Sequence, residues 1–180
     1  MEDNILDINE DNTHLKIIPY YLKHGLIAVF LSIIFSMIIF FLGLEYEQRF
    51  QYVMLLSPIS LMVICLHTYK KDNGNKLKGS RGFQMCLMMF VFYGVLMGLF
   101  TLLYISVVSP DFINGLKAVT VEKMKERGLE DEMIAMQMKY ASFFFSPIWL
   151  FTISLLMSTI YGLVFSGITA AIMKTPNKSN

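Results

Sequence analysis

The chain has 180 residues, of which 55% are hydrophobic and 16% are charged, and it carries a formal net charge of +1. Soluble domains average about 25% charged residues, so this composition favours a membrane protein, and the near-neutral balance argues against a general affinity for nucleic acid. The two cysteines, Cys65 and Cys86, both fall in apolar segments, which predicts no disulfide framework.

The first stretch of the chain, residues 1–16, is polar and acidic. A cleavable signal would be basic and then apolar, so we expect an acidic N-terminal tail followed by an uncleaved first membrane helix. We divide the chain into this tail, a transmembrane domain over residues 17–174 and a C-terminal tail over residues 175–180.

Four long apolar segments contain no Asp, Glu, Lys or Arg, and they cover residues 25–44, 50–68, 82–110 and 141–173. About 20 apolar residues cross a hydrocarbon core as a helix, and backbone polar groups in lipid must be satisfied internally. The segments predict an all-α integral membrane four-helix bundle with helices near 20–44, 50–68, 83–108 and 142–173. Pumps, ion-coupled transporters and voltage sensors usually carry ionisable residues at membrane depth, so these classes are disfavoured.

The connections between the first three helices differ in length and charge. The link over residues 45–51 is short, so helices one and two form an antiparallel hairpin, and Pro58 predicts a kink near residues 54–58. The next connection turns at Asn73 and Gly74. It is the most basic part of the chain, and we call its five cations the basic loop: Lys70, Lys71, Lys76, Lys78 and Arg81.

Residues 109–141 are predicted to form an amphipathic helical hairpin between helices three and four. Ser109 is the expected N-cap, with Pro110 in the first turn, and Gly128 suits a helix C′ position that separates the two arms. The helical spacing of the apolar residues places a group of them against protein or bilayer: Phe112, Leu116, Met133 and Ile134.

The cations also predict the orientation. One side of the bundle would hold the basic loop with Lys16, Lys23, Lys174 and Lys178, whereas the five cations of the 109–141 hairpin are offset by six acids. By the positive-inside rule, both termini and the basic loop lie in the cytoplasm and the hairpin lies outside.

Small residues recur on helices three and four. Such residues let membrane helices approach closely and let hydroxyls bond across them. We interpret them as packing within the protomer, with a homodimer seam and the lining of a lipid or solute path as alternatives. They are Ser154, Ser158, Gly162, Ser166 and Ala170 on helix four, and Gly94 and Gly98 on helix three.

Two groups of side chains raise the question of a metal, and we predict neither a metal nor a cofactor at them. Zinc could be held by His24, Cys65, His67 and Cys86, but Cys65 and His67 are two residues apart and point about 200° apart on a helix. Buried thiols and interfacial imidazoles explain this group. Thioethers could bind Cu(I) at Met133, Met136 and Met138, but Met also fills apolar surfaces.

The loop and cap residues resemble the bacterial four-transmembrane domain-of-unknown-function family 4199. The resemblance covers the chain from about Tyr21 and departs from the family pattern at residues 77–80, which are more basic here. It implies a membrane fold and no established activity. The matching motifs are YK at 69–70, DNG at 72–74, Phe83, SPDF at 109–112, ERGLEDE at 126–132, Ile134, SP at 146–147 and AAIMK at 170–174.

No acid and base pair near a serine or cysteine, so we expect a protein that is not an enzyme. The preferred interpretation is an accessory subunit of a bacterial inner membrane, which acts through contacts with lipids, a membrane protein partner or a second copy, and not with nucleic acid. The basic loop could attract anionic headgroups. The alternative is a small carrier or flippase-like protein for lipid-linked or amphiphilic substrates, with a polar groove lined by Ser57, Ser60 or Tyr93.

Overall fold

A computed structural model of the chain describes residues 13–175, with side chains from Ile17 onward except those of Gln48 and Gln51. Residues 1–12 of the acidic tail and residues 176–180, with Lys178, lie outside the described residues. Every regular element in the described part is helical, and four of its helices are long and apolar enough to span a membrane. The fold is therefore all-α, and the chain is a multi-pass membrane protein.

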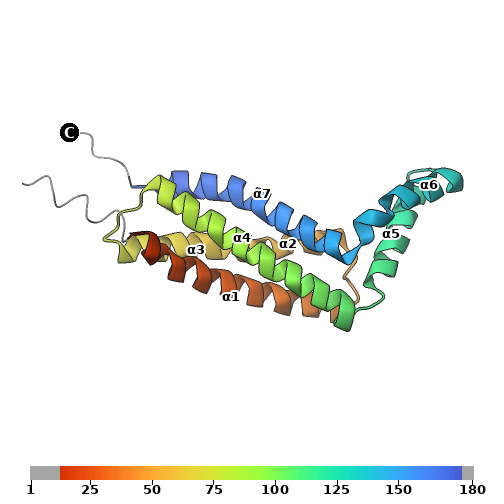
Figure 1. Ribbon diagram of the computed structural model, residues 1–180, viewed down its shortest axis with the longest axis horizontal. Helices are drawn as coiled ribbons and strands as arrows, with labels where there is room; N and C mark the ends of the chain where they lie inside the picture. The colour runs from red at the N-terminus through yellow and green to blue at the C-terminus, as the bar shows by residue number, and fades with distance from the viewer. Residues whose placement is uncertain (1–12, 176–180) are drawn as a thin grey trace, which may run out of the picture.

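The four long helices are α1 (Thr13–Phe41), α3 (Leu56–Asp72), α4 (Gly79–Leu103) and α7 (Pro147–Met173). They run side by side along the long axis of the molecule (Figure 1). Helix α4 is central, because it packs on α7, on α1 and on α3, whereas α7 has α4 as its main neighbour. We call the two ends of the bundle the basic end, which holds the basic loop, and the hairpin end.

The second predicted helix is broken at Leu55. The short helix α2 (Gln48–Met54) precedes the break and α3 follows it. Pro58 lies in the first turn of α3, where a missing backbone N–H costs little. This break lies within residues 54–58, where the kink was predicted.

A helical hairpin projects from the bundle at the hairpin end (Figure 1) and consists of α5 (Phe112–Glu126) and α6 (Asp131–Ala141). Gly128 has a φ of +78°, its N–H bonds to the carbonyl of Lys125 at 2.9 Å, and the N–H of Leu129 bonds to Met124 at 3.3 Å. These two bonds form a Schellman motif, so the predicted C′ role of Gly128 is confirmed. Lys125 and Asp131 form an ion pair of 3.2 Å across the turn.

Several predicted helix boundaries are wrong. Helix α1 extends back to Thr13 and was expected from about residue 20, and α4 begins at Gly79 and was expected from residue 83. Ser109 does not cap α5; its N–H bonds to Tyr104 at the end of a π-helical turn (Tyr104–Val108), and Asp111 is the N-cap residue. The fourth membrane helix starts at Pro147 and not near residue 142, because a residue before proline disfavours the α region. Ser146 is extended, and its Oγ accepts a hydrogen bond from Trp149 N at 3.3 Å. A 3-10 helix (Ser142–Phe145) links α6 to this cap.

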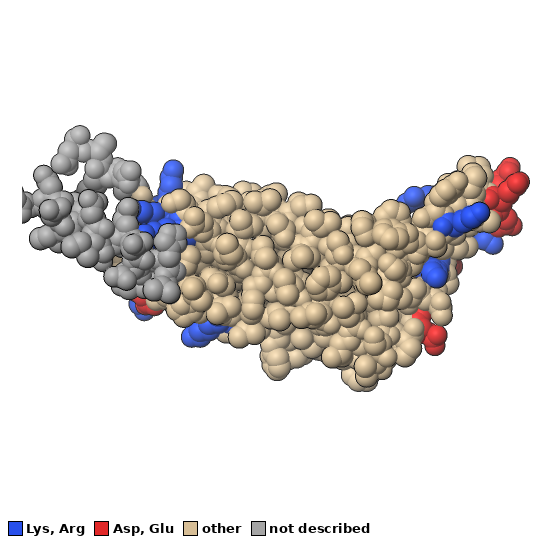
Figure 2. Space-filling model, in the orientation of Figure 1, with Lys and Arg blue, Asp and Glu red and all other residues tan. Residues whose placement is uncertain are grey.

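Charged and apolar residues separate along the long axis. In the face shown in Figure 2, Lys, Arg, Asp and Glu gather toward the two ends and an uncharged band lies between them. Large apolar side chains on the bundle point outward, among them Phe30 at 65% exposed and Ile172 at 77%. An apolar outer surface is what a bilayer requires of membrane-spanning helices.

Candidate functional site

The small residues bring α4 and α7 into close contact. A Cβ added to Gly94 would lie 2.7 Å from the Cβ and Oγ of Ser158, and one added to Gly162 would lie 2.7 Å from the Cβ of Phe90. A Cβ on Gly98 would meet the ring of Phe151 at 2.7 Å. The two helix backbones therefore approach as closely as small residues allow.

The serine and alanine positions of α7 follow the same contact. Ser158, Gly162, Ser166 and Ala170 are buried, and Ser154 is half-buried. Ala170 lies 3.4 Å from a Cβ built on Gly82 of α4. The four buried residues are occupied by packing inside the protomer, so they offer no free face for a homodimer seam.

Hydrogen bonds tie the basic loop to the end of α7. Lys70 Nζ donates to the carbonyl of Met173 at 3.0 Å, where a cation also complements the helix C-terminus. Leu77 N donates to Thr175 Oγ1 at 2.9 Å, and Thr175 N donates back to the Leu77 carbonyl at 3.0 Å. Lys71, Lys76 and Lys78 are exposed, whereas Lys70 and Arg81 are half-buried.

The zinc candidates do not converge. Cys65 and Cys86 are buried in the core at the basic end, His24 is buried with Nδ1 2.8 Å from the Tyr20 carbonyl, and His67 is exposed. Within residues 13–175, no three His, Cys, Asp or Glu side chains are grouped to hold a metal. Of the copper candidates on α6, Met133 and Met136 are 44% and 55% exposed, and Met138 is half-buried.

A cavity at the hairpin end is the candidate site. Its volume is about 80 Å³, and we call it the hairpin-end cavity. Its walls come from α1, the α1–α2 connection, α2, the π-helical turn and α5. The lining residues are Ser36, Ile39, Glu45, Glu47, Phe50, Met54, Tyr104 and Phe112.

The turn after α1 places Glu45 in this wall. Gly43 has a φ of +68°, its N–H bonds to the carbonyl of Phe40, and the N–H of Leu44 bonds to that of Ile39, both at 3.0 Å. This Schellman motif ends the helix and folds the chain back over the bundle end. Tyr104 then donates a 2.5 Å hydrogen bond to Glu45 Oε2.

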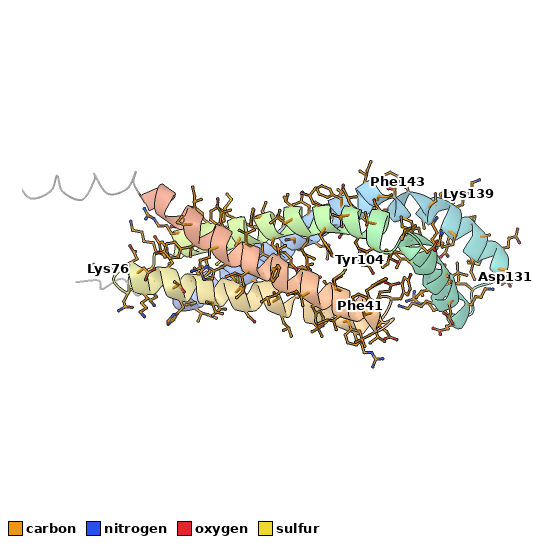
Figure 3. All side chains as sticks on the ribbon, turned by 90° about the horizontal axis from the view of Figure 1, so that it is seen from below. Phe41, Lys76, Tyr104, Asp131, Lys139 and Phe143 are labelled. Atoms are coloured by element: carbon orange, nitrogen blue, oxygen red, sulfur yellow. The ribbon has the colours of Figure 1, made fainter. Side chains whose placement is uncertain are left out.

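Aromatic rings pack on one another beside the hydrogen bond between Tyr104 and Glu45. The Tyr104 ring meets the rings of Phe40 and Phe112 edge to face, with centroids 5.9 and 5.4 Å away, and Figure 3 shows Tyr104 at the junction of bundle and hairpin. The Tyr46 ring stacks on Phe112 at 5.6 Å, and its hydroxyl packs against Gly115. Burial raises the pKa of the Tyr46 phenol, and the Glu45 carboxylate raises it further.

The sequence predicted none of this grouping. In the sequence, Glu45 is one of several charged residues in a short connection, and Tyr104 lies inside an apolar segment. The available signal was Gly43, a helix-ending residue with an acid two positions later. The partner of that acid, Tyr104 of the π-helical turn, is 59 residues away. Phe112 was expected to face protein or bilayer, and it contacts protein through Tyr46 and Tyr104.

A family model described as protein of unknown function (DUF4199) matches residues 23–175. The chain belongs to this family. No protein of the curated collection and no solved structure matches it. The match includes the hairpin-end cavity, the small-residue contact and the basic loop, so these features belong to the part of the chain that defines it as a DUF4199 member. The family description assigns no activity to any of them.

Proposed function

We propose that this DUF4199 member is a non-enzymatic protein of the bacterial inner membrane that acts as an accessory subunit, through contacts with lipids or a membrane protein partner. The observation that carries the proposal is how the polar side chains of the bundle interior are used. Among the described residues, hydroxyls between the helices bond to other parts of the protein.

Ser32 and Tyr93, both buried, lie with their hydroxyl oxygens 3.0 Å apart, which joins α1 to α4. Ser57 donates to the carbonyl of Ala28 at 3.2 Å, which joins α3 to α1. In the described part of the chain, no buried side-chain N or O lacks a hydrogen-bond partner. A carrier groove between the helices would need such hydroxyls to face its lumen, so their use in helix packing favours the accessory function.

The orientation forms part of the same proposal. The basic loop and the end of α7 meet at the basic end, where cations dominate the visible charge (Figure 2). The positive-inside rule places this end in the cytoplasm and the α5–α6 hairpin on the opposite side.

Thiol labelling tests the closed interior. Ser57→Cys should resist a water-soluble maleimide in reconstituted vesicles, because its position is held against α1. Ser80→Cys, at the exposed start of α4, should react and serves as the positive control. Rapid labelling of Ser57→Cys in the folded protein would favour the carrier alternative.

A further inference from the structure

Two carboxylates, Glu45 and Glu47, line the hairpin-end cavity, and that of Glu45 has no cation partner among the described residues. Glu45 is half-buried and accepts its hydrogen bond from a neutral tyrosine hydroxyl. Among the described residues, neither Lys nor Arg forms an ion pair with it. Arg49, the nearest cation in sequence, pairs with Glu47 at 3.2 Å and is 87% exposed. Charges buried in proteins are usually paired with an opposite charge. Glu45 is half-buried and has no such pair, so its carboxylate is available to a cationic ligand that enters the cavity.

The walls of the cavity suit an organic cation. Aromatic faces attract ammonium groups by cation–π interaction, and the rings of Phe50, Tyr104 and Phe112 line the same cavity as Glu45. Ile39 and Met54 supply apolar contacts for the carbon atoms next to the charge. A strongly hydrated metal ion would gain little from these walls.

The volume limits the size of the ligand. On a comparable scale, one water needs roughly 10–15 Å³ and a dry cavity of about 150 Å³ accepts benzene. The hairpin-end cavity, at about 80 Å³, has room for a group of a few heavy atoms, such as an aminoethyl group. A trimethylammonium group is bulkier at the charged end and fits less well.

We propose that the hairpin-end cavity binds a primary ammonium group, carried by an aminolipid headgroup or by a free alkylamine, with Glu45 as the counter-charge. The first membrane-capable span ends at Phe41, and the second runs from Tyr52, within α2, to the end of α3. The cavity therefore lies at the level where the first span ends and the second begins. Exposed apolar side chains flank it in sequence, including Phe41 at 82% and Leu56 at 60%. They offer a surface for the acyl chains of a lipid whose headgroup enters the cavity.

The lipid form of this inference rests on the proposed lipid contacts. The test uses the purified full chain in maltoside micelles, with phosphatidylethanolamine, phosphatidylcholine, phosphatidylglycerol or soluble ethanolamine added at equal ionic strength. The thermal midpoint and the lipid retained in native mass spectra are measured. Phosphatidylethanolamine should raise the midpoint and be retained above the other two lipids, and ethanolamine should act at higher concentration.

Glu45→Gln keeps the shape and removes the charge, so it should weaken the apparent affinity for the ammonium group about tenfold or more. Glu122→Gln is the matched control, because Glu122 is exposed on α5 and does not line the cavity. If Glu45→Gln does not fold, the preference of the wild-type protein for phosphatidylethanolamine over phosphatidylcholine and phosphatidylglycerol decides whether the site binds an ammonium group.

Three results would overturn the inference: no effect of phosphatidylethanolamine or ethanolamine beyond that of NaCl, equal binding of phosphatidylcholine, or unchanged affinity in folded Glu45→Gln. Ethanolamine as potent as the lipid would support the site and assign it to a free amine. Lipid movement between leaflets, measured separately in vesicles, tests the accessory function, so either proposal can fail without the other.

Discussion

Ser158 of α7 donates a 2.5 Å hydrogen bond to the backbone carbonyl of Phe90 in α4. The bond forms where Gly94 leaves room for the serine, since a Cβ on that glycine would lie 2.7 Å from Ser158 Oγ. One serine and one glycine thus give the two helices both close packing and a polar link. Lipid offers no hydrophobic drive for helix association, so contacts of this kind hold membrane helices together.

Ser158→Ala should destabilise the protein modestly. Hydrogen bonds between membrane helices contribute about 0.6 kcal/mol on average and about 1.7 kcal/mol at most. The Phe90 carbonyl remains within helix α4 in the variant, so the loss should stay in this range. Unfolding in mixed detergent micelles measures the change. Thr159→Ala is the control, because its hydroxyl bonds to Leu155 in its own helix at 2.8 Å. Equal losses in both variants would mean that the bond between α4 and α7 adds nothing.

Gly162→Leu should be far more damaging than Leu163→Ala. Even a Cβ at residue 162 would lie 2.7 Å from the Cβ of Phe90, so the larger side chain must push α4 and α7 apart, at a cost of about 1–3 kcal/mol or more. Leu163 is 47% exposed on the outer surface, and its truncation leaves the contact intact. Size-exclusion profiles after graded heating compare the two, and similar profiles would contradict the packing described for α7.

Tyr46→Ala should loosen the hairpin. The Tyr46 ring stacks on Phe112 at 5.6 Å and its hydroxyl reaches Gly115, so its loss removes a contact between the α1–α2 connection and α5. Trypsin should then cut faster after Lys123, Lys125 or Arg127. Tyr52→Ala, which removes a tyrosine that is 63% exposed, should leave the cleavage rate at the wild-type value. A rate in Tyr46→Ala equal to that of Tyr52→Ala would show that α5 is held by other contacts.

Reporter fusions test the orientation. Fusions after Asn180 and within residues 70–81 should report the cytoplasm, and one within residues 117–127 should report the opposite side. The reason is the concentration of cations at the basic end, which the positive-inside rule retains in the cytoplasm. The reverse pattern would contradict the proposed orientation.

The membrane helices were predictable because lipid imposes one strong rule, that a spanning segment be long, apolar and helical. The residues that cap the helices were harder to predict from the sequence. Gly128 needs a positive φ, which few other residues adopt, and its role was read correctly. The prediction that Ser109 caps α5 was wrong because the preceding helix extends as a π-helical turn through Val108. No local sequence pattern indicates that extension.

The hairpin-end cavity escaped prediction for a different reason. Glu45 and Tyr104 come from separate elements, and their contact depends on the register of α1 against α4, which apolar periodicity does not define. The small residues of α7 predicted close packing, but not that α4 would be the partner along the whole helix. Pairing in space is set by side-chain fit, and a single sequence shows only which residues permit it.

We propose that this protein acts through contacts and does not itself move lipids between leaflets. The most direct measurement reconstitutes the purified chain into vesicles with a fluorescent lipid and adds a membrane-impermeant quencher. We expect quenching to stop at the outer leaflet, as it does in vesicles without protein. Loss of the inner-leaflet signal in proportion to the amount of folded protein would contradict it and identify a lipid carrier.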